Sequence, residues 1–161
     1  MVPPDLPTLD MWTFPSASRY SMPIKYHPNQ ASLVAVNFDK GFKEPEMVKT
    51  RLAVVMSKPI ARRVGLCTIV PLSTTPPNHV MPYHGEIDIG FDLPHGWSRF
   101  CWVKGDMITS VGFHRVELIR LGRDRNSKRQ YLTRPLDDAI FLAVQRYALH
   151  GLGLSVLTKK L

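Results

Sequence analysis

Two short apolar runs constrain the fold of this chain more than any other feature. They are LAVVM at residues 52–56 and LCTIVP at residues 66–71, both rich in Val, Ile and Leu. Runs of five or six residues bounded by polar or turn-forming residues are too short for a typical helix, so each predicts a β-strand. The segment SKPIARRVG between them is predicted to be a turn that carries Arg62 and Arg63.

A polar group of residues is expected at one end of this strand pair. If the strands pair in antiparallel fashion, Arg51 at the start of the first lies level with Ser73 and Thr74 at the end of the second. Side-chain chemistry alone favours a simpler interpretation, in which the arginine pairs with a surface carboxylate and the Ser/Thr turn satisfies its own backbone. The alternative is a site that combines a fixed cation with a row of hydroxyls.

Other short runs repeat the strand pattern along the chain. SLVAVNF at residues 32–38 and EIDIGF at residues 86–91 alternate as half-buried strands do, and FCWV at residues 100–103 is a further apolar run. A strand pair across a basic loop is expected from residues 113–121 and 129–133.

After these strands the apolar period changes to that of a helix. Pro135 and the acidic pair at residues 137–138 suit a helix N-terminus, and apolar residues recur at helical spacing from Ile140 to Gly151. Several short strands and one late helix predict a mainly β (α+β) fold, a small, strongly curved β-barrel with the helix packed against it. We expect one such domain over residues 29–161.

The first 28 residues have a different character. They hold six of the fourteen prolines, which indicates an extension that is irregular or laid along the domain surface. Four aromatic residues indicate that part of it docks: Trp12, Phe14, Tyr20 and Tyr26. Because this segment has neither a basic leader nor an uninterrupted hydrophobic stretch, we expect a cytoplasmic protein without membrane contact.

Charge and cysteine usage narrow the class of partner. A net charge of +8 and a pI near 9.8 favour a polyanion, with nucleic acid as the leading candidate. The densest basic cluster falls in the hairpin loop, where a solvated loop is the alternative to a nucleic-acid contact: Arg120, Arg123, Arg125, Lys128 and Arg129. Cys67 and Cys101 lie inside apolar runs, which favours buried reduced thiols over a disulfide or a metal site.

Familiar catalytic signatures are missing from the sequence. It contains no Walker-type phosphate loop, dinucleotide fingerprint, nucleophile elbow or metal-ligand helix. Lys104 and Asp106 are two residues apart and would point the same way on an extended chain, either as a working pair or as a weak surface ion pair. Among six scattered histidines, His84 alone stands out, because it follows the hydroxyl row in a long loop.

An ordered set of segments resembles a known family. FDKGFKEPE at residues 38–46, Arg51 before AVVMS, VPLSTT at residues 70–75 and WVKGDMITSVGFHR at residues 102–115 occur in the order found in the MazF/PemK toxins. The chain is similar to the larger YifN-like branch of that family, over about residues 23–121. The resemblance implies an SH3-like barrel of the MazF/PemK/CcdB type that forms a homodimer and is silenced by a cognate antitoxin.

The resemblance also implies an activity. Members are metal-independent endoribonucleases without a cofactor, in which the ribose 2′-hydroxyl attacks the adjacent phosphate and leaves a cyclic phosphate. Arg51 matches the family's strand-start arginine, and Ser73 matches an active threonine, with Thr74 as an adjacent substitute. Lys104 and Asp106 match the arginine and aspartate that act as acid and base in the PemK-like scheme.

Three positions depart from the family pattern. Leu52 replaces the usual proline after the arginine, which removes a conformational restraint, and Lys104 lacks the planar fork of arginine. Phe42 stands where PemK-like members carry a first-loop histidine. The PemK-type triad is therefore incomplete in this chain.

The chemistry of RNA cleavage assigns a role to each matched residue. Arg51 would stabilise charge on the phosphate and Ser73 or Thr74 would orient its oxygens, with Asp106 as proton acceptor and Lys104 as donor. Single-stranded RNA would be held by basic, aromatic and loop residues: Arg62, Arg63, Tyr83, His84, Arg120, Arg123 and Arg125, with Trp97 as a second aromatic that could stack. The alternatives are a catalytically silent RNA- or protein-binding module of the same fold, and a CcdB-like topoisomerase poison.

Overall fold

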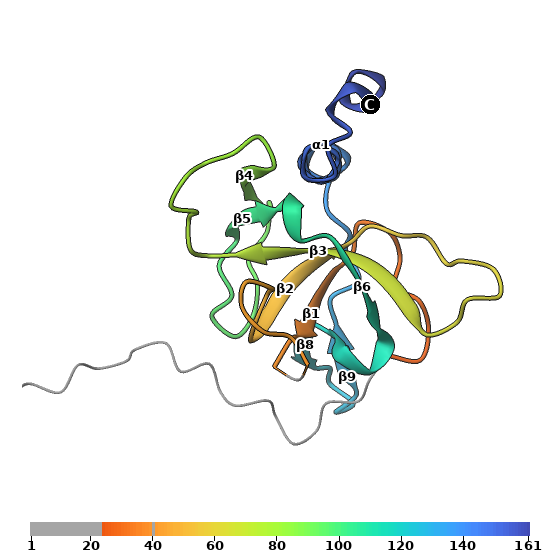
Figure 1. The fold of residues 1–161 in the computed structure, drawn as a ribbon. Helices are drawn as coiled ribbons and strands as arrows, with labels where there is room; N and C mark the ends of the chain where they lie inside the picture. The colour runs from red at the N-terminus through yellow and green to blue at the C-terminus, as the bar shows by residue number, and fades with distance from the viewer. Residues whose placement is uncertain (1–23, 40) are drawn as a thin grey trace, which may run out of the picture.

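Short strands make up most of the part of the chain that the structure describes, residues 24–39 and 41–161 of a computed structural model (Figure 1). The strands are β1 (Leu33–Asn37), β2 (Thr50–Val55), β3 (Leu66–Ser73), β4 (His84–Asp88), β5 (Phe100–Lys104), β6 (Thr109–Gly112), β7 (Val116–Leu118), β8 (Arg120–Arg123) and β9 (Arg129–Tyr131). The helices are α1 (Asp138–Gly151) and the short 3-10 helices η1 (Gly105–Met107), η2 (Phe113–Arg115) and η3 (Ser155–Lys160).

Seven strands form one sheet whose path turns at β3. The order is β4-β5-β3-β2-β1-β7 with β6 paired to β3, and β8 and β9 form a separate hairpin. Residues 66–69 of β3 pair with β6, whereas Leu72 and Ser73 pair with β5. In Figure 1, β3 therefore crosses the molecule from the β2–β3 loop to the β4–β5 pair. Among the described residues no ladder joins β4 to β7, so the sheet is barrel-like without closing.

The continuous apolar runs are explained by burial on both faces of the central strands. In β2, Leu52 and Val54 pack into one core cluster with Val144 and Ala148 of α1. The alternate residues of β2 pack into a second cluster on the other face of the sheet, with residues of β1, β3, β6 and β7. Successive strand side chains point to opposite faces, so a strand buried on both faces reads as an unbroken apolar run. The mainly β fold with a C-terminal helix is confirmed.

The predicted strands and helix match the structure in place, with two corrections. The strand predicted over residues 86–91 is β4 at His84–Asp88, so His84 begins a strand and does not lie in the loop, and the structure departs from the prediction between residues 105 and 118. The backbone leaves the extended conformation after Lys104 and forms η1, so the expectation of an extended Lys104-Gly105-Asp106 is wrong. The single strand expected over residues 113–121 is also wrong, because η2 interrupts it and β7 pairs with β1 instead of β9. The hairpin across the basic loop exists, with β8 as its first strand.

The N-terminal extension falls almost wholly outside the described residues, including Trp12, Phe14 and Tyr20. Ile24 packs against the second core cluster and its N–H donates to the Val116 carbonyl, at 3.4 Å. Tyr26 is 85% exposed, so its ring is not among the groups that dock the described end of the extension. Within the described ranges, no helix has the length and apolarity needed to span a bilayer.

Candidate active site

Arg51 lies where the strand pairing predicts. Ala53 pairs with Pro71 in the antiparallel β2–β3 ladder, so both Arg51 and Ser73 lie two residues beyond this pair, at the same end of the sheet. Arg51 also pairs with Val36 of β1, and its Nε donates to the Val48 carbonyl at 3.2 Å. It has no carboxylate partner among the described residues, so its terminal amino groups remain available for an anion. The ladder and this hydrogen bond restrain an arginine that lacks the family's proline.

The two neighbouring hydroxyls differ in their surroundings. Ser73 is only 8% exposed, and its Oγ accepts a hydrogen bond from the Thr75 N–H at 3.1 Å. Thr74 is exposed and lines a shallow, open depression beside Arg51. The depression is lined by Arg51, Leu52, Leu72, Thr74, Trp97 and Cys101. The arginine and one hydroxyl of the predicted set therefore share a surface, while the other hydroxyl stabilises its own turn.

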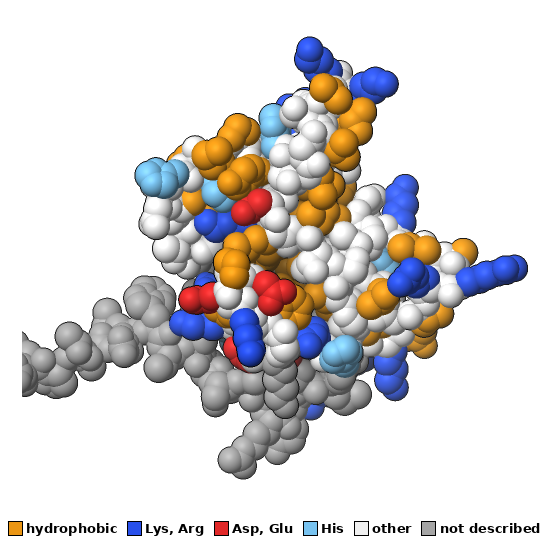
Figure 2. All heavy atoms as spheres, viewed as in Figure 1, with side chains coloured by type: hydrophobic (Ala, Val, Ile, Leu, Met, Phe, Trp, Pro, Cys, Tyr) orange, Lys and Arg blue, Asp and Glu red, His pale blue; other side chains and the backbone are white. Residues whose placement is uncertain are grey.

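Lys104 connects this surface to Asp106. Burial lowers the pKa of the Lys104 ammonium, and its two charged neighbours act in opposite directions, Asp106 raising the pKa and Arg51 lowering it. Lys104 therefore lies within electrostatic reach of both residues, although η1 rather than an extended strand carries Asp106. On the face viewed in Figure 2, basic, acidic and histidine side chains gather over β4, β5 and η1.

A tight turn before β4 places His84 beside this pair. Pro82 and Tyr83 are the central residues of the turn, which is closed by the His84 N–H donating to the Met81 carbonyl at 2.8 Å. The His84 Nε2 lies 3.6 Å from Asp106 Oδ1, and His84 pairs with Lys104 in the β4–β5 ladder. The Tyr83 ring packs edge-on against the imidazole, with centroids 4.5 Å apart.

Close approach of α1 explains the glycine between Lys104 and Asp106. A Cβ at Gly105 would overlap the Tyr147 carbonyl of α1 and lie 2.8 Å from the Tyr83 carbonyl oxygen. The Gly105 N–H donates to that same Tyr83 carbonyl at 3.0 Å. The helix backbone therefore presses directly on the segment that carries Lys104 and Asp106, and only glycine leaves room for it.

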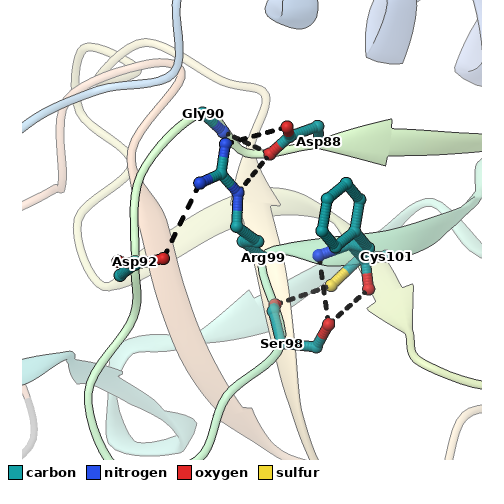
Figure 3. A network of polar contacts seen from close by, with 7 residues as sticks. Asp88, Gly90, Asp92, Ser98, Arg99 and Cys101 are labelled. Carbon is teal, nitrogen blue, oxygen red and sulfur yellow. Dashed lines mark hydrogen bonds and ion pairs between the residues drawn. The ribbon is translucent and has the colours of Figure 1, made fainter.

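A polar network orders the β4–β5 loop (Figure 3). The same loop carries Trp97, which lines the depression. Arg99 binds both carboxylate oxygens of Asp88 at 2.8 Å and lies 3.7 Å from Asp92. The Arg99 guanidinium and the Gly90 N–H lower the pKa of Asp88. The loop is thus held at both of its ends, since Asp88 ends β4 and Arg99 precedes β5.

Other candidates lie in other parts of the molecule. Arg62 and Arg63 are exposed in the β2–β3 loop, at the opposite end of these strands from Arg51. The basic cluster belongs to the β8–β9 hairpin, outside the seven-stranded sheet. Asp124 accepts hydrogen bonds from the Asn126 and Lys128 N–H groups at 2.9 Å and so shapes the hairpin turn.

The free cysteines and Phe42 have packing roles. Burial raises the pKa of the Cys67 and Cys101 thiols to about 11, as expected for buried thiols, and neither forms a disulfide. Phe42 packs against Phe38 with ring centroids 5.1 Å apart and lies under the Arg115 guanidinium. Within residues 24–39 and 41–161, no group of three His, Cys, Asp or Glu side chains could hold a metal ion.

Comparison with known proteins identifies the family. The model for PemK-like, MazF-like toxins of type II toxin-antitoxin systems matches residues 29–146. The chain belongs to this family. It is 26% identical to the uncharacterized protein YifN of Escherichia coli strain K12 over 132 residues, 80% of this chain and 83% of YifN.

One solved structure supports the fold of this family member. MazF from Deinococcus radiodurans superposes with a TM-score of 0.53 at 22% identity, over 80% of this chain and 98% of that protein. An endoribonuclease from a mycobacterial species, solved in complex with its cognate antitoxin, gives a TM-score of 0.49 at 16% identity, over 80% and 97% of the two chains.

Sequence reasoning missed the contact between His84 and Asp106 in this toxin. It placed His84 among RNA-binding residues, because the two positions are far apart in the chain. The available signal was the sequence Met81-Pro82-Tyr83-His84, a turn in front of a predicted strand. The β4–β5 register that brings the turn to Asp106 cannot be read from local pattern.

Proposed function

We propose that this chain is the toxin of a type II toxin-antitoxin system and acts as an endoribonuclease on single-stranded RNA. Attack by a ribose 2′-hydroxyl on the adjacent phosphate would leave a cyclic phosphate and a free 5′-hydroxyl. The observation that carries the proposal is the half-buried Arg51, restrained by a strand ladder and within electrostatic reach of Lys104.

Each step of this reaction has a residue suited to it. Arg51 stabilises the charge that develops on the pentacoordinate phosphate, because a guanidinium stays charged and binds two oxygens at once. Asp106, with its side chain 34% exposed, accepts the proton of the 2′-hydroxyl. Lys104 donates a proton to the leaving 5′-oxygen, and its lowered pKa brings the donor closer to neutral pH. None of these steps requires a metal.

Thr74 is the better choice for the hydroxyl that orients the phosphate. It is exposed beside Arg51 in the depression, whereas the buried Ser73 hydroxyl already accepts the Thr75 N–H. Trp97 lines the same depression and offers a flat surface on which a flanking base can stack.

Family membership supports two protein partners. A cognate antitoxin would silence the toxin, and a second copy of the chain would form a homodimer. Sedimentation of the purified chain tests the dimer, because a monomer at micromolar concentration contradicts it. Co-purification with the product of a neighbouring reading frame tests the antitoxin.

Cleavage of a single-stranded RNA without secondary structure, in the presence of EDTA, tests the activity. We expect wild type to cleave, and Arg51→Ala to lower the rate by about 10²–10³-fold, as loss of a single charge-stabilising group does. Arg63→Ala is the matched control, since it removes the same charge from an exposed loop at the other end of β2 and β3.

Two results would contradict the proposal. RNA that binds to wild type yet stays intact with and without Mg²⁺ would indicate a silent binding module. Equal losses for Arg51→Ala and Arg63→Ala would show that bulk charge, rather than a site at Arg51, supports the activity.

A further inference from the structure

The side chain of His84 is fixed by its own turn. The Met81 N–H points at the imidazole Nδ1, 3.3 Å away, while the His84 N–H donates to the Met81 carbonyl. Two hydrogen bonds between the same two residues hold the ring in one orientation. The His84 side chain is only 10% exposed, and the Tyr83 ring covers one side of it.

This hydrogen bond also determines the tautomer of the neutral ring. A nitrogen that accepts a hydrogen bond carries no proton, so the ring proton lies on Nε2. Nε2 is the atom that faces Asp106, 3.6 Å from Oδ1. His84 is therefore set up to donate to the carboxylate and not to take a proton from substrate.

Backbone contacts fix the position of His84 relative to Asp106. The Gly105 N–H donates to the Tyr83 carbonyl at 3.0 Å, which ties the turn to the residue before Asp106. A Cβ at Gly85 would overlap the Tyr147 ring of α1, so this side chain packs directly against the residue after His84, whereas the helix backbone itself packs against Gly105. The turn, η1 and α1 thus form one support around Asp106.

We propose that His84 is a positioning residue of the ribonuclease site, which donates from Nε2 to Asp106 and aims the carboxylate at the 2′-hydroxyl of the substrate. This role rests on the proposed function. The contact is longer than a hydrogen bond in the free protein, as catalytic contacts often are before substrate binds. When His84 donates to one carboxylate oxygen of Asp106, the other oxygen remains available for the proton of the 2′-hydroxyl. The Asp106 side chain is more exposed than that of His84, 34% against 10%.

Two near-isosteric variants separate this role from a contact with RNA. The side-chain amide of His84→Gln reaches about as far as Nε2, and so can still donate to Asp106. The shorter His84→Asn keeps an acceptor near Nδ1 for the Met81 N–H but does not reach the carboxylate. His79→Ala is the control, because it removes an exposed histidine from the loop that precedes β4.

Single-turnover cleavage and binding of a non-cleavable 2′-deoxy analogue are measured for each variant. We expect His84→Ala and His84→Asn to cleave about 10–100-fold more slowly with analogue binding changed less than threefold, as for misplacement of a catalytic group. His84→Gln should recover most of the rate, and His79→Ala should match wild type. In an Asp106→Asn background, His84→Ala should cause no further loss. Circular dichroism and thermal unfolding check the fold of each variant.

The outcomes distinguish this role from the function on which it rests. A wild-type protein that leaves RNA intact overturns both. If wild type cleaves and His84→Ala cleaves equally fast, His84 has no positioning role, although the proposed function stands. The same conclusion follows if His84→Ala loses analogue binding by the same factor as it loses cleavage rate. Nitrogen-15 NMR of the imidazole gives an answer that needs no activity: the proposal requires the proton on Nε2, and a proton on Nδ1 overturns it.

Discussion

Arg51 and Arg63 lie at opposite ends of the same pair of strands, and their surroundings differ. Arg51 is half-buried, paired in a ladder, bonded to the Val48 carbonyl and electrostatically coupled to Lys104. Arg63 is exposed in a ten-residue connection between β2 and β3. In a chain of net charge +8, positive charge alone does not identify a functional site. We propose that the restrained cation, with an acid and a hydroxyl nearby, marks the site, while exposed cations attract RNA to the surface as a whole.

The largest effect is expected from substitution of Asp106, the carboxylate on the Arg51 side of the molecule. Asp106→Asn keeps the size of the side chain but removes the proposed proton acceptor, so cleavage should fall by about 10²–10⁴-fold. Single-turnover rates on one RNA substrate measure the loss. Asp92→Asn removes the same charge from a side chain that is 94% exposed, and should leave the rate within twofold of wild type, about the limit of such an assay. Comparable losses for both variants would refute the comparison.

The support beneath the site should be nearly as sensitive. An alanine at Gly105 would collide with the α1 backbone, so Gly105→Ala should cost about 1–3 kcal/mol of unfolding free energy, together with cleavage activity. Gly112→Ala is the matched control, since its Cβ would meet only the exposed His114 ring, which can move. Thermal unfolding of the two variants should separate by several degrees. An unchanged melting temperature for Gly105→Ala would show that α1 does not press on the site.

Lys104 gives the site a pH dependence that Arg63 cannot give. Burial lowers the pKa of Lys104, so its proton is lost at a lower pH than that of an ordinary lysine. The proposed donor works only while protonated, and cleavage should therefore fall about tenfold per pH unit once the pH exceeds the lowered pKa. Lys104→Arg keeps its proton at all accessible pH values and should remove this alkaline limb. Rates corrected for base hydrolysis of the RNA alone provide the measurement.

Removal of the two hydroxyls should have different effects, on the cleavage rate at Thr74 and on stability at Ser73. Thr74→Ala should slow cleavage by about fivefold to tenfold, the value of one hydrogen bond, without changing the melting temperature. Ser73→Ala leaves the Thr75 N–H without its acceptor and should lower stability by about 1 kcal/mol. If Ser73→Ala gives the larger loss of rate in a fully folded protein, the assignment of the working hydroxyl reverses.

The smallest effect is expected from the basic hairpin. Replacing Arg123 and Arg125 by Gln should weaken RNA binding several-fold and reduce its salt dependence, with kcat unchanged. The salt titration of binding tests this directly. A fall in kcat would mean that the hairpin reaches the reacting phosphate.

Local pattern predicted most of the fold and half of the site. The runs over residues 52–56 and 66–71 indicated two strands, and antiparallel pairing then placed Arg51 level with Ser73. The departure at η1 was missed because the close approach of α1, which forces the turn at Gly105, is a tertiary contact. The contact between His84 and Asp106 was missed for a similar reason, because it depends on the β4–β5 register, which local pattern does not reveal.

The chemistry of the RNA ends distinguishes attack by the 2′-hydroxyl from other routes of cleavage. The cleavage position is mapped first, and the ribose 5′ to it is then replaced by 2′-deoxyribose in an otherwise identical RNA. The account predicts a cyclic phosphate and a 5′-hydroxyl from the unmodified RNA, and an intact modified RNA that still binds. Cleavage of the 2′-deoxy substrate at the same position, or 5′-phosphate ends, would contradict it.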